Sequence, residues 1–318
     1  MSVTILINLL KVQGTAVNVS TPRLLDSAIP ALAFEFSFLT HIILSICATS
    51  FRIRLVHGRS RYATLSHVFM GRAINGQMAS VAGGIDRGNF EAVYTTSIFI
   101  AANTVSQHQF LPVKGQTTSD LGKCVVEWLR AFRNVRSVVA ASRREFAQSS
   151  LAASFPRGGW QNLSVPDINP KSSQVVFGFL LDELTAGAAQ DERCSVYHHV
   201  VVGLSSIYEQ PSREAFMRFL VEARPDFLLY VEAGEPLALM LMGVCFGLTR
   251  LLPPADMMDK GAERDLEAIS LHLPPYHSLL LERAIGIIRI HPGYHESTEI
   301  PNFEAKQISD KPQPTSSA

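Results

Sequence analysis

Histidine pairs are the residues of this chain whose types come closest to a metal or catalytic site. His198 and His199 are adjacent, and His291 and His295 are separated by a proline–glycine step. Neighbouring positions on a helix point about 100° apart, so His198 and His199 cannot easily share one ion. The proline and glycine also spoil the i, i+4 geometry that a helix would give to the other pair. We therefore expect packing or surface roles, and no metal site.

Catalytic signatures are missing from the sequence. The segment 203–207 reads Gly-Leu-Ser-Ser-Ile, which lacks the closing glycine of a nucleophile elbow, so we expect Ser205 to be an ordinary helix residue. We find no P-loop, no G-x-G-x-x-G and no H-E-x-x-H. The cysteines lie far apart and without C-x-x-C spacing, which predicts small core residues: Cys47, Cys124, Cys194 and Cys245. No catalytic residue and no cofactor are predicted.

Basic residues form two clusters, which raises the question of nucleic-acid binding. The chain holds 28 Lys and Arg against 28 Asp and Glu, and neither cluster alternates with aromatic residues. Solvated helix faces are the favoured interpretation, and direct DNA binding by this chain is not expected. The clusters are Arg52, Arg54, His57, Arg59 and Arg61, and Arg130, Arg133, Arg136, Arg143 and Arg144.

Helical periodicity dominates the chain from about Phe34 to Ile290, which predicts an all-α fold without a significant β-sheet. The strongest helix spans residues 119–140, with Ser119 and Asp120 as capping residues. Ser212 is expected to cap a short helix. The other expected helices cover residues 62–81, 90–105, 174–186, 194–208, 236–252, 262–272 and 276–290.

The predicted organisation is a single large helical domain over residues 28–292. Residues 1–27 are expected to be an N-terminal extension, and residues 293–318 a disordered tail. The segment 155–173, with three prolines and a Gly-Gly pair, predicts a long loop between two helical halves. Two apolar segments, 28–51 and 236–252, are assigned to buried helices, so no membrane span is expected.

The helix expected from Pro236 is apolar on every side, which excludes a surface position. Met240, Met242, Cys245 and Phe246 are the candidate lining of an apolar ligand pocket, because methionine adapts to irregular shapes. The alternative is that these residues simply fill the core. Both interpretations stay open at this point.

Short motifs in order along the chain resemble the regulatory domain of fungal binuclear zinc-cluster transcription factors of the sterol-uptake-control type. The segment 29–45, IPALAFEFSFLTHIILS, is similar to the "P-x-L-A-F-x-x-x-F-L-x-H-x-I-L" stretch of that family. Further on, Ser66-His67 resembles the "A-x-x-H" helix of that family, and Asn89 before Phe90-Glu91-Ala92 resembles the start of its asparagine-led helix. The segment 127–136, EWLRAFRNVR, is similar to a "W-L-x-x-x-R-G-(V/I)-R" helix, with Asn134 where glycine is usual. Pro236-Leu237-Ala238-Leu239 resembles a "P-x-A-L" core helix.

Three features of the family are missing from this sequence. They are the six-cysteine zinc cluster, the usual histidine-rich opening, and a tryptophan-rich segment after the core helix. The first departure weighs against DNA binding by this chain, and the third against sterol binding.

The resemblance implies an all-helical effector domain in the nucleus that acts through dimerisation, ligand sensing or protein contacts. The expected partners are a second copy or a related regulator, and an apolar small molecule. Regulation of genes of sterol or secondary metabolism is implied by the same resemblance. The alternatives are an uncharacterised enzyme of fungal secondary metabolism, with Glu35 and His41 as a buried polar pair, and a helical scaffold.

Overall fold

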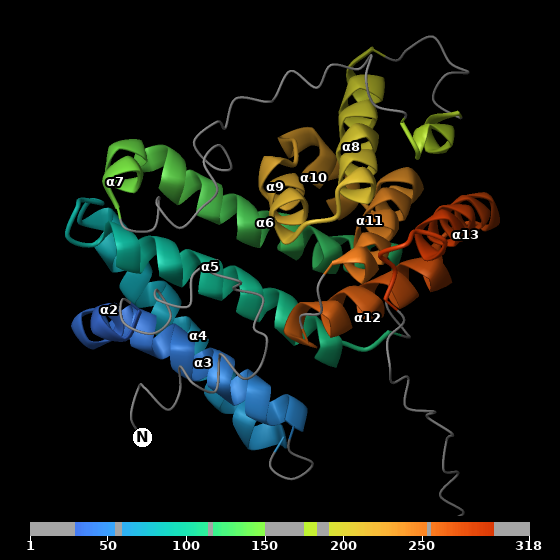
Figure 1. The fold of residues 1–318 in the computed structure, drawn as a ribbon. Coiled ribbons are helices and arrows are strands. Elements are labelled where there is room, and N and C mark those ends of the chain that lie inside the picture. Colours follow the sequence, from blue (N-terminus) through green and yellow to red (C-terminus); the bar gives the residue numbers. More distant parts are fainter. Residues whose placement is uncertain are drawn as a thin grey trace, which may run out of the picture.

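The computed structural model describes residues 29–54, 59–113, 117–149, 175–182, 191–252 and 256–295. Within these ranges the chain is helical and forms no strand, which confirms the predicted all-α class. Figure 1 shows the elements in chain order, which are α2 (Ile29–Glu35), α3 (Ser37–Arg54), α4 (Arg59–Ala82), α5 (Phe90–Gln107), η2 (His108–Phe110), α6 (Thr118–Ala141), α7 (Arg143–Gln148), η4 (Gly178–Leu181), α8 (Asp191–Glu209), α9 (Arg213–Glu222), α10 (Pro225–Glu232), α11 (Pro236–Leu248), η5 (Thr249–Leu251), α12 (Asp256–His272) and α13 (Pro275–Arg289).

Helix α5 lies between the α3–α4 hairpin and helix α6, and it contributes to both hydrophobic cores of the described structure (Figure 1). Its residues Ala92, Val93 and Phe99 pack with α3 in a smaller core. Its residues Tyr94 and Val105 belong to the larger core, which α6 and α8–α13 complete. Since α5 is covered on two sides, most of its positions are buried.

A network of hydrogen-bonded polar side chains joins α3, α4 and α5 beside the smaller hydrophobic core. Thr49 donates to Asn103 Oδ1 at 2.8 Å, and the Asn103 amide donates to Ser45 Oγ at 2.8 Å. Gln107 Nε2 lies 2.6 Å from Thr49 Oγ1 and 2.9 Å from Ser66 Oγ. Each helix places its members on one face, and their mutual hydrogen bonds satisfy groups that would otherwise be costly to bury.

Helix α6 begins at Thr118, one residue earlier than the sequence predicted, and it begins with a capping box. Thr117 Oγ1 accepts from the Asp120 amide, and the Asp120 carboxylate accepts from the Thr117 amide. The cap is therefore Thr117 and not Ser119. A Cβ at Gly122 would overlap the Val231 carbonyl oxygen, so α6 and α10 touch backbone to backbone there.

Helix α11 is the centre of the larger core, and all its residues after Pro236 are buried. Pro236 occupies the first helical position, where its missing N–H costs nothing. α8, α12 and α13 pack around this helix. At Gly243 and Gly247 the side chains of Leu281 and Ile285 come close enough that a Cβ would meet them.

Of the other helices expected from the sequence, some were found and some were not. Ser212 caps α9, as predicted, by accepting from the Ala215 amide. The helix predicted at 174–186 is wrong within its described part, where only the short 3-10 helix η4 forms. Helix α10 was not predicted at all. The extension 1–27, the loop 155–173 and the tail from 296 onward lie outside the described residues.

Among the described helices, none is by itself long and apolar enough to cross a membrane. Two bent pairs reach the required length and composition when joined: Ile29–Glu35 with Ser37–Ile53, at 118°, and Pro225–Glu232 with Pro236–Leu251, at 105°.

Candidate functional site

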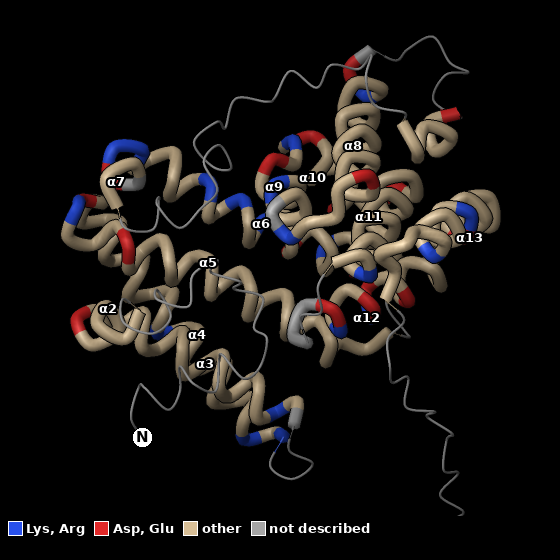
Figure 2. Tube along the Cα trace, in the orientation of Figure 1, with Lys and Arg blue, Asp and Glu red and all other residues tan. Residues whose placement is uncertain are grey.

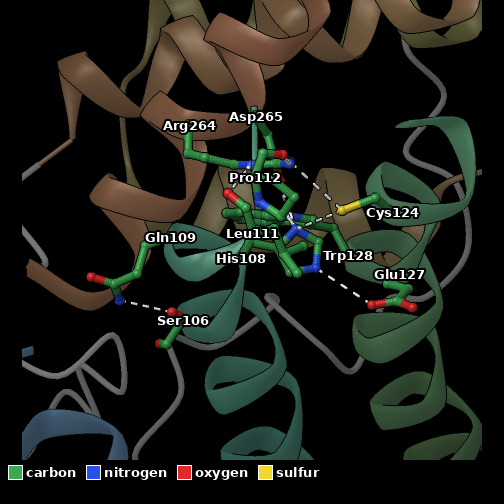
Figure 3. Close-up of polar contacts among 10 residues, drawn as sticks. All are labelled: Ser106, His108, Gln109, Leu111, Pro112, Cys124, Glu127, Trp128, Arg264 and Asp265. Atoms are coloured by element: carbon green, nitrogen blue, oxygen red, sulfur yellow. Dashed lines mark hydrogen bonds and ion pairs between the residues drawn. The ribbon is translucent and has the colours of Figure 1, made fainter. Parts of the chain in front are cut away.

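A cluster of buried polar side chains lies where η2, α6 and α12 meet (Figure 3). His108 comes from η2, Cys124 and Trp128 from adjacent turns of α6, and Arg264 and Asp265 from α12. His108 is 1% exposed and Asp265 is 0% exposed. We call these five residues the histidine–aspartate cluster.

The Asp265 carboxylate contacts three other members of the cluster, which are His108, Trp128 and Arg264. Its Oδ2 lies 2.7 Å from His108 Nδ1 and accepts from Trp128 Nε1 at 2.8 Å. Its Oδ1 accepts from NH1 of Arg264 at 2.5 Å. Two cations and one N–H donor thus satisfy both oxygens, as a buried carboxylate requires.

Arg264 also ties the cluster to the connection between α5 and α6. Its Nε donates to the Leu111 carbonyl at 3.3 Å, and NH2 donates to the Pro112 carbonyl. Its NH1 lies 3.7 Å from the Cys124 sulfur. The Arg264 guanidinium therefore links α12 to α6 and to the segment that follows η2.

His108 is held as an imidazolium by these contacts. Burial alone would lower the pKa of His108, but hydrogen bonds with Asp265, Cys124 and Glu127, and the charge of Asp265, raise it to about 11. Glu127 Oε2 lies 3.5 Å from His108 Nε2 at the edge of the cluster, with its side chain 57% exposed. The ion pair with Asp265 is consequently present at neutral pH.

Donor atoms of His108, Cys124 and Asp265 lie within 4.8 Å of one another, a spacing that three ligands of one metal ion can have. The Arg264 guanidinium already lies among these atoms, so a divalent ion would be added beside a fixed cation. The Trp128 N–H, which cannot bind a metal, occupies the Asp265 oxygen nearest the histidine. The cluster fits a buried ion-pair network better than a metal centre.

The four candidate pocket residues of α11 are all buried in the larger core: Met240, Met242, Cys245 and Phe246. The Phe246 ring packs against the Trp128 ring, with centroids 4.9 Å apart, so this core adjoins the histidine–aspartate cluster. Burial raises the pKa of the Cys245 thiol, which keeps it protonated and unreactive. Their role as a ligand lining remains a prediction.

A cavity of about 150 Å³ lies elsewhere, between α8 and α9. Its lining combines polar and apolar side chains of the two helices. The lining residues are His199, Val200, Val202, Gly203, Ser206, Ile207, Ala215, Arg218, Phe219, Glu222 and Ala223, none of which belongs to α11.

The histidines expected to have packing or surface roles have ordinary surroundings. His198 is exposed on α8, and His199 is half-buried beside it. The His291 ring packs edge-on against Tyr208, with centroids 4.8 Å apart, and its Nδ1 accepts from the Gly293 amide. Ser205 lies within α8, as predicted, where its hydroxyl accepts from the Phe177 amide at 3.3 Å.

The described residues of the first basic cluster lie where α3 ends and α4 begins, and those of the second lie along the C-terminal half of α6 and at the start of α7. Figure 2 shows blue segments near the ends of α3 and α4 and on α7. Arg52 is used inside the molecule, since its guanidinium lies 3.6 Å from the Phe110 ring centroid and donates to Gln107. Arg130 pairs with Glu232 at 2.6 Å. His57 lies outside the described residues.

The polar pair that an enzyme interpretation required is not buried. Glu35 is exposed at the end of α2, and His41 is half-buried on α3, stacked on Phe69 with centroids 6.2 Å apart. Burial and the charge of Arg72 lower the pKa of His41. Neither side chain enters the core.

Sequence reasoning missed the histidine–aspartate cluster. His108 and Asp265 lie 157 positions apart, and no local motif links them. The local sequence offers little signal, because Arg264 and Asp265 follow Glu263 in a run of three charged residues within an amphipathic helix.

Comparison with known proteins gives one informative similarity. No family model matches the chain, and no solved structure matches it. A Zn(2)-C6 fungal-type transcription factor of Gibberella zeae is 23% identical over 254 residues, which cover 75% of this chain and 51% of that protein. The chain thus spans about half the length of this relative. Over three quarters of its length, the chain is similar to a fungal zinc-cluster transcription factor.

Proposed function

We propose that this chain acts as the effector domain of a fungal transcription regulator, in the nucleus, through dimerisation, ligand sensing or contacts with other regulators. The observation that carries the proposal is the similarity to the Gibberella zeae transcription factor over 254 residues. The all-helical fold agrees with it. Genes of sterol or secondary metabolism are the proposed targets, on the resemblance of the sequence motifs alone.

Self-association is part of this proposal, and exposed apolar side chains support it. Leu271, at the end of α12, is 58% exposed, and Tyr276 and Leu279, on the first turns of α13, are 50% and 65% exposed. Apolar side chains gathered in one region of a surface are typical of protein contacts. We expect Leu279→Lys to weaken self-association in light scattering at tens of micromolar protein. Leu229→Lys, at an equally exposed leucine of α10, is the matched control.

The apolar ligand belongs to the proposal as well. Met240, Met242, Cys245 and Phe246 would admit a ligand only by rearranging, because their side chains already fill the core. Methionine permits such rearrangement more readily than branched residues do. A ligand at this place would therefore bind to a minor, opened conformation.

A reporter assay tests the regulatory role. The full chain is fused to a heterologous DNA-binding domain in a fungal host, with the DNA-binding domain alone as control. We expect the fusion to change reporter expression several-fold. Unchanged expression from a fusion that accumulates to the control level would contradict the proposal and favour the scaffold or enzyme alternatives.

A further inference from the structure

The cavity between α8 and α9 is formed by matching stripes on the two helices. His199, Gly203 and Ser206 follow one face of α8, and Ala215, Phe219 and Glu222 are among the residues that follow one face of α9. Gly203 lets α8 and α9 pack closely, since a Cβ there would stand 3.0 Å from Phe219 Cδ2. The two small residues, Gly203 and Ala215, leave the space that larger side chains would fill.

The volume of the cavity sets the size of a guest. A space of about 150 Å³, lined by both apolar and polar side chains and bordered by the exposed Ser206, has room for a molecule the size of benzene. Sterols and other drug-sized molecules need roughly 300 Å³ or more. The part of a guest that this space can surround is therefore a single ring.

The polar groups of the lining set its chemistry. Arg218 and Glu222 carry opposite charges, so the lining offers no excess charge to an ionic guest. Burial raises the pKa of Glu222, against the charges of Arg218 and Arg136, and burial lowers the pKa of His199, ahead of the effects of Arg224 and His198. His199 is accordingly neutral at pH 7, with one donor and one acceptor nitrogen. A guest hydroxyl can donate to the Glu222 carboxylate or exchange a hydrogen bond with His199.

We propose that this cavity binds an uncharged single-ring molecule with one hydroxyl group, of the size and chemistry of phenol. The ring would lie against Val202, Ile207 and Phe219, and the hydroxyl would face His199 and Glu222. The inference rests on the proposed function, which it deepens by naming the ligand class and its place.

Ligand-observed NMR and thermal unfolding of the full chain with phenol test the site. We expect phenol to bind and to raise the melting temperature, and benzoate, which is charged, to do neither. Ala215→Leu should abolish phenol binding, because the new side chain fills the cavity. Ala79→Leu, at an exposed alanine of α4, is the matched control and should leave binding unchanged.

Two further variants guard against a folding defect. Ser206→Trp changes an exposed residue of the lining, and it should weaken phenol binding about tenfold or more without lowering the melting temperature. Glu222→Gln should weaken binding of phenol but not of benzene, which has no hydroxyl. Absence of phenol binding to the wild type, or binding that survives both Ala215→Leu and Ser206→Trp, would overturn the proposal.

The experiments can refute the regulatory role and the cavity ligand independently of each other. Phenol binding is measured on the purified chain without any reporter, so an active reporter fusion without phenol binding contradicts only the cavity. Phenol binding with an inactive fusion contradicts only the regulatory role.

Discussion

Replacing Asp265 by asparagine should strongly destabilise the domain. The variant keeps the shape of the side chain but removes the anion that His108 and Arg264 share. Breaking a fully buried ion pair by removing one partner typically costs about 3–5 kcal/mol, because a charge is left uncompensated. For a domain of this size we expect a fall in melting temperature of roughly 5–15 °C.

The pH dependence of the wild type gives a second readout of the same pair. The folded-state pKa of His108 is about 11, above the ordinary value of 6.5. The contribution of the ion pair is therefore fully present below about pH 6.5 and is lost as the pH rises toward 11. In Asp265→Asn the anion is gone, and burial lowers the His108 pKa, so this residue should destabilise the fold as the pH falls below about 6.5.

Urea unfolding at several pH values between about 6 and 9 measures both effects. Glu127→Gln is the control, because Glu127 lies at the exposed edge of the cluster and should contribute no more than about 1 kcal/mol. The reasoning fails if Asp265→Asn loses less than about 1 kcal/mol, or if its stability keeps the pH slope of the wild type.

Three other sets of substitutions test packing described above. Gly122→Ala should lower the free energy of unfolding by roughly 1–3 kcal/mol, because a Cβ would push α6 away from the Val231 carbonyl. Thermal unfolding followed by circular dichroism measures this loss, and an unchanged midpoint would contradict the close contact. Thr117→Ala should cost about 1 kcal/mol through loss of the capping box, measurable in the same way. Met242→Ala and Phe246→Ala should cost roughly 2–5 kcal/mol each in a filled core. A markedly smaller loss, with stabilisation of the wild type by added sterols or fatty acids, would instead support the α11 pocket.

The sequence predicted best where local signals were strong. α6 shows a long apolar stripe, and α11 starts at a proline and is apolar throughout, so both were found within a few residues of their observed bounds. α9 was found through its serine cap. In each case the determining interactions lie within one or two turns of the helix.

The failures have a common physical cause, which is that long-range contacts decide the structure. α10 is only eight residues long, and its placement depends on α6, although Pro225 at its first position was a usable signal. The residues near 178 form a 3-10 turn in which Phe177 and Leu180 are buried by neighbours from α8. The histidine–aspartate cluster and the α8–α9 cavity both require the tertiary arrangement, which no local pattern encodes.

The central position of α5 has a consequence for dissecting this protein into fragments. Removing the α2–α4 part would expose Ala92, Val93 and Phe99, while removing α6 together with the later helices would expose Tyr94 and Val105. Either fragment would present an apolar surface of α5 to water, and such surfaces favour aggregation. A cut on either side of α5 should therefore yield insoluble pieces, so deletion series and two-hybrid baits need to keep residues 29–295 together.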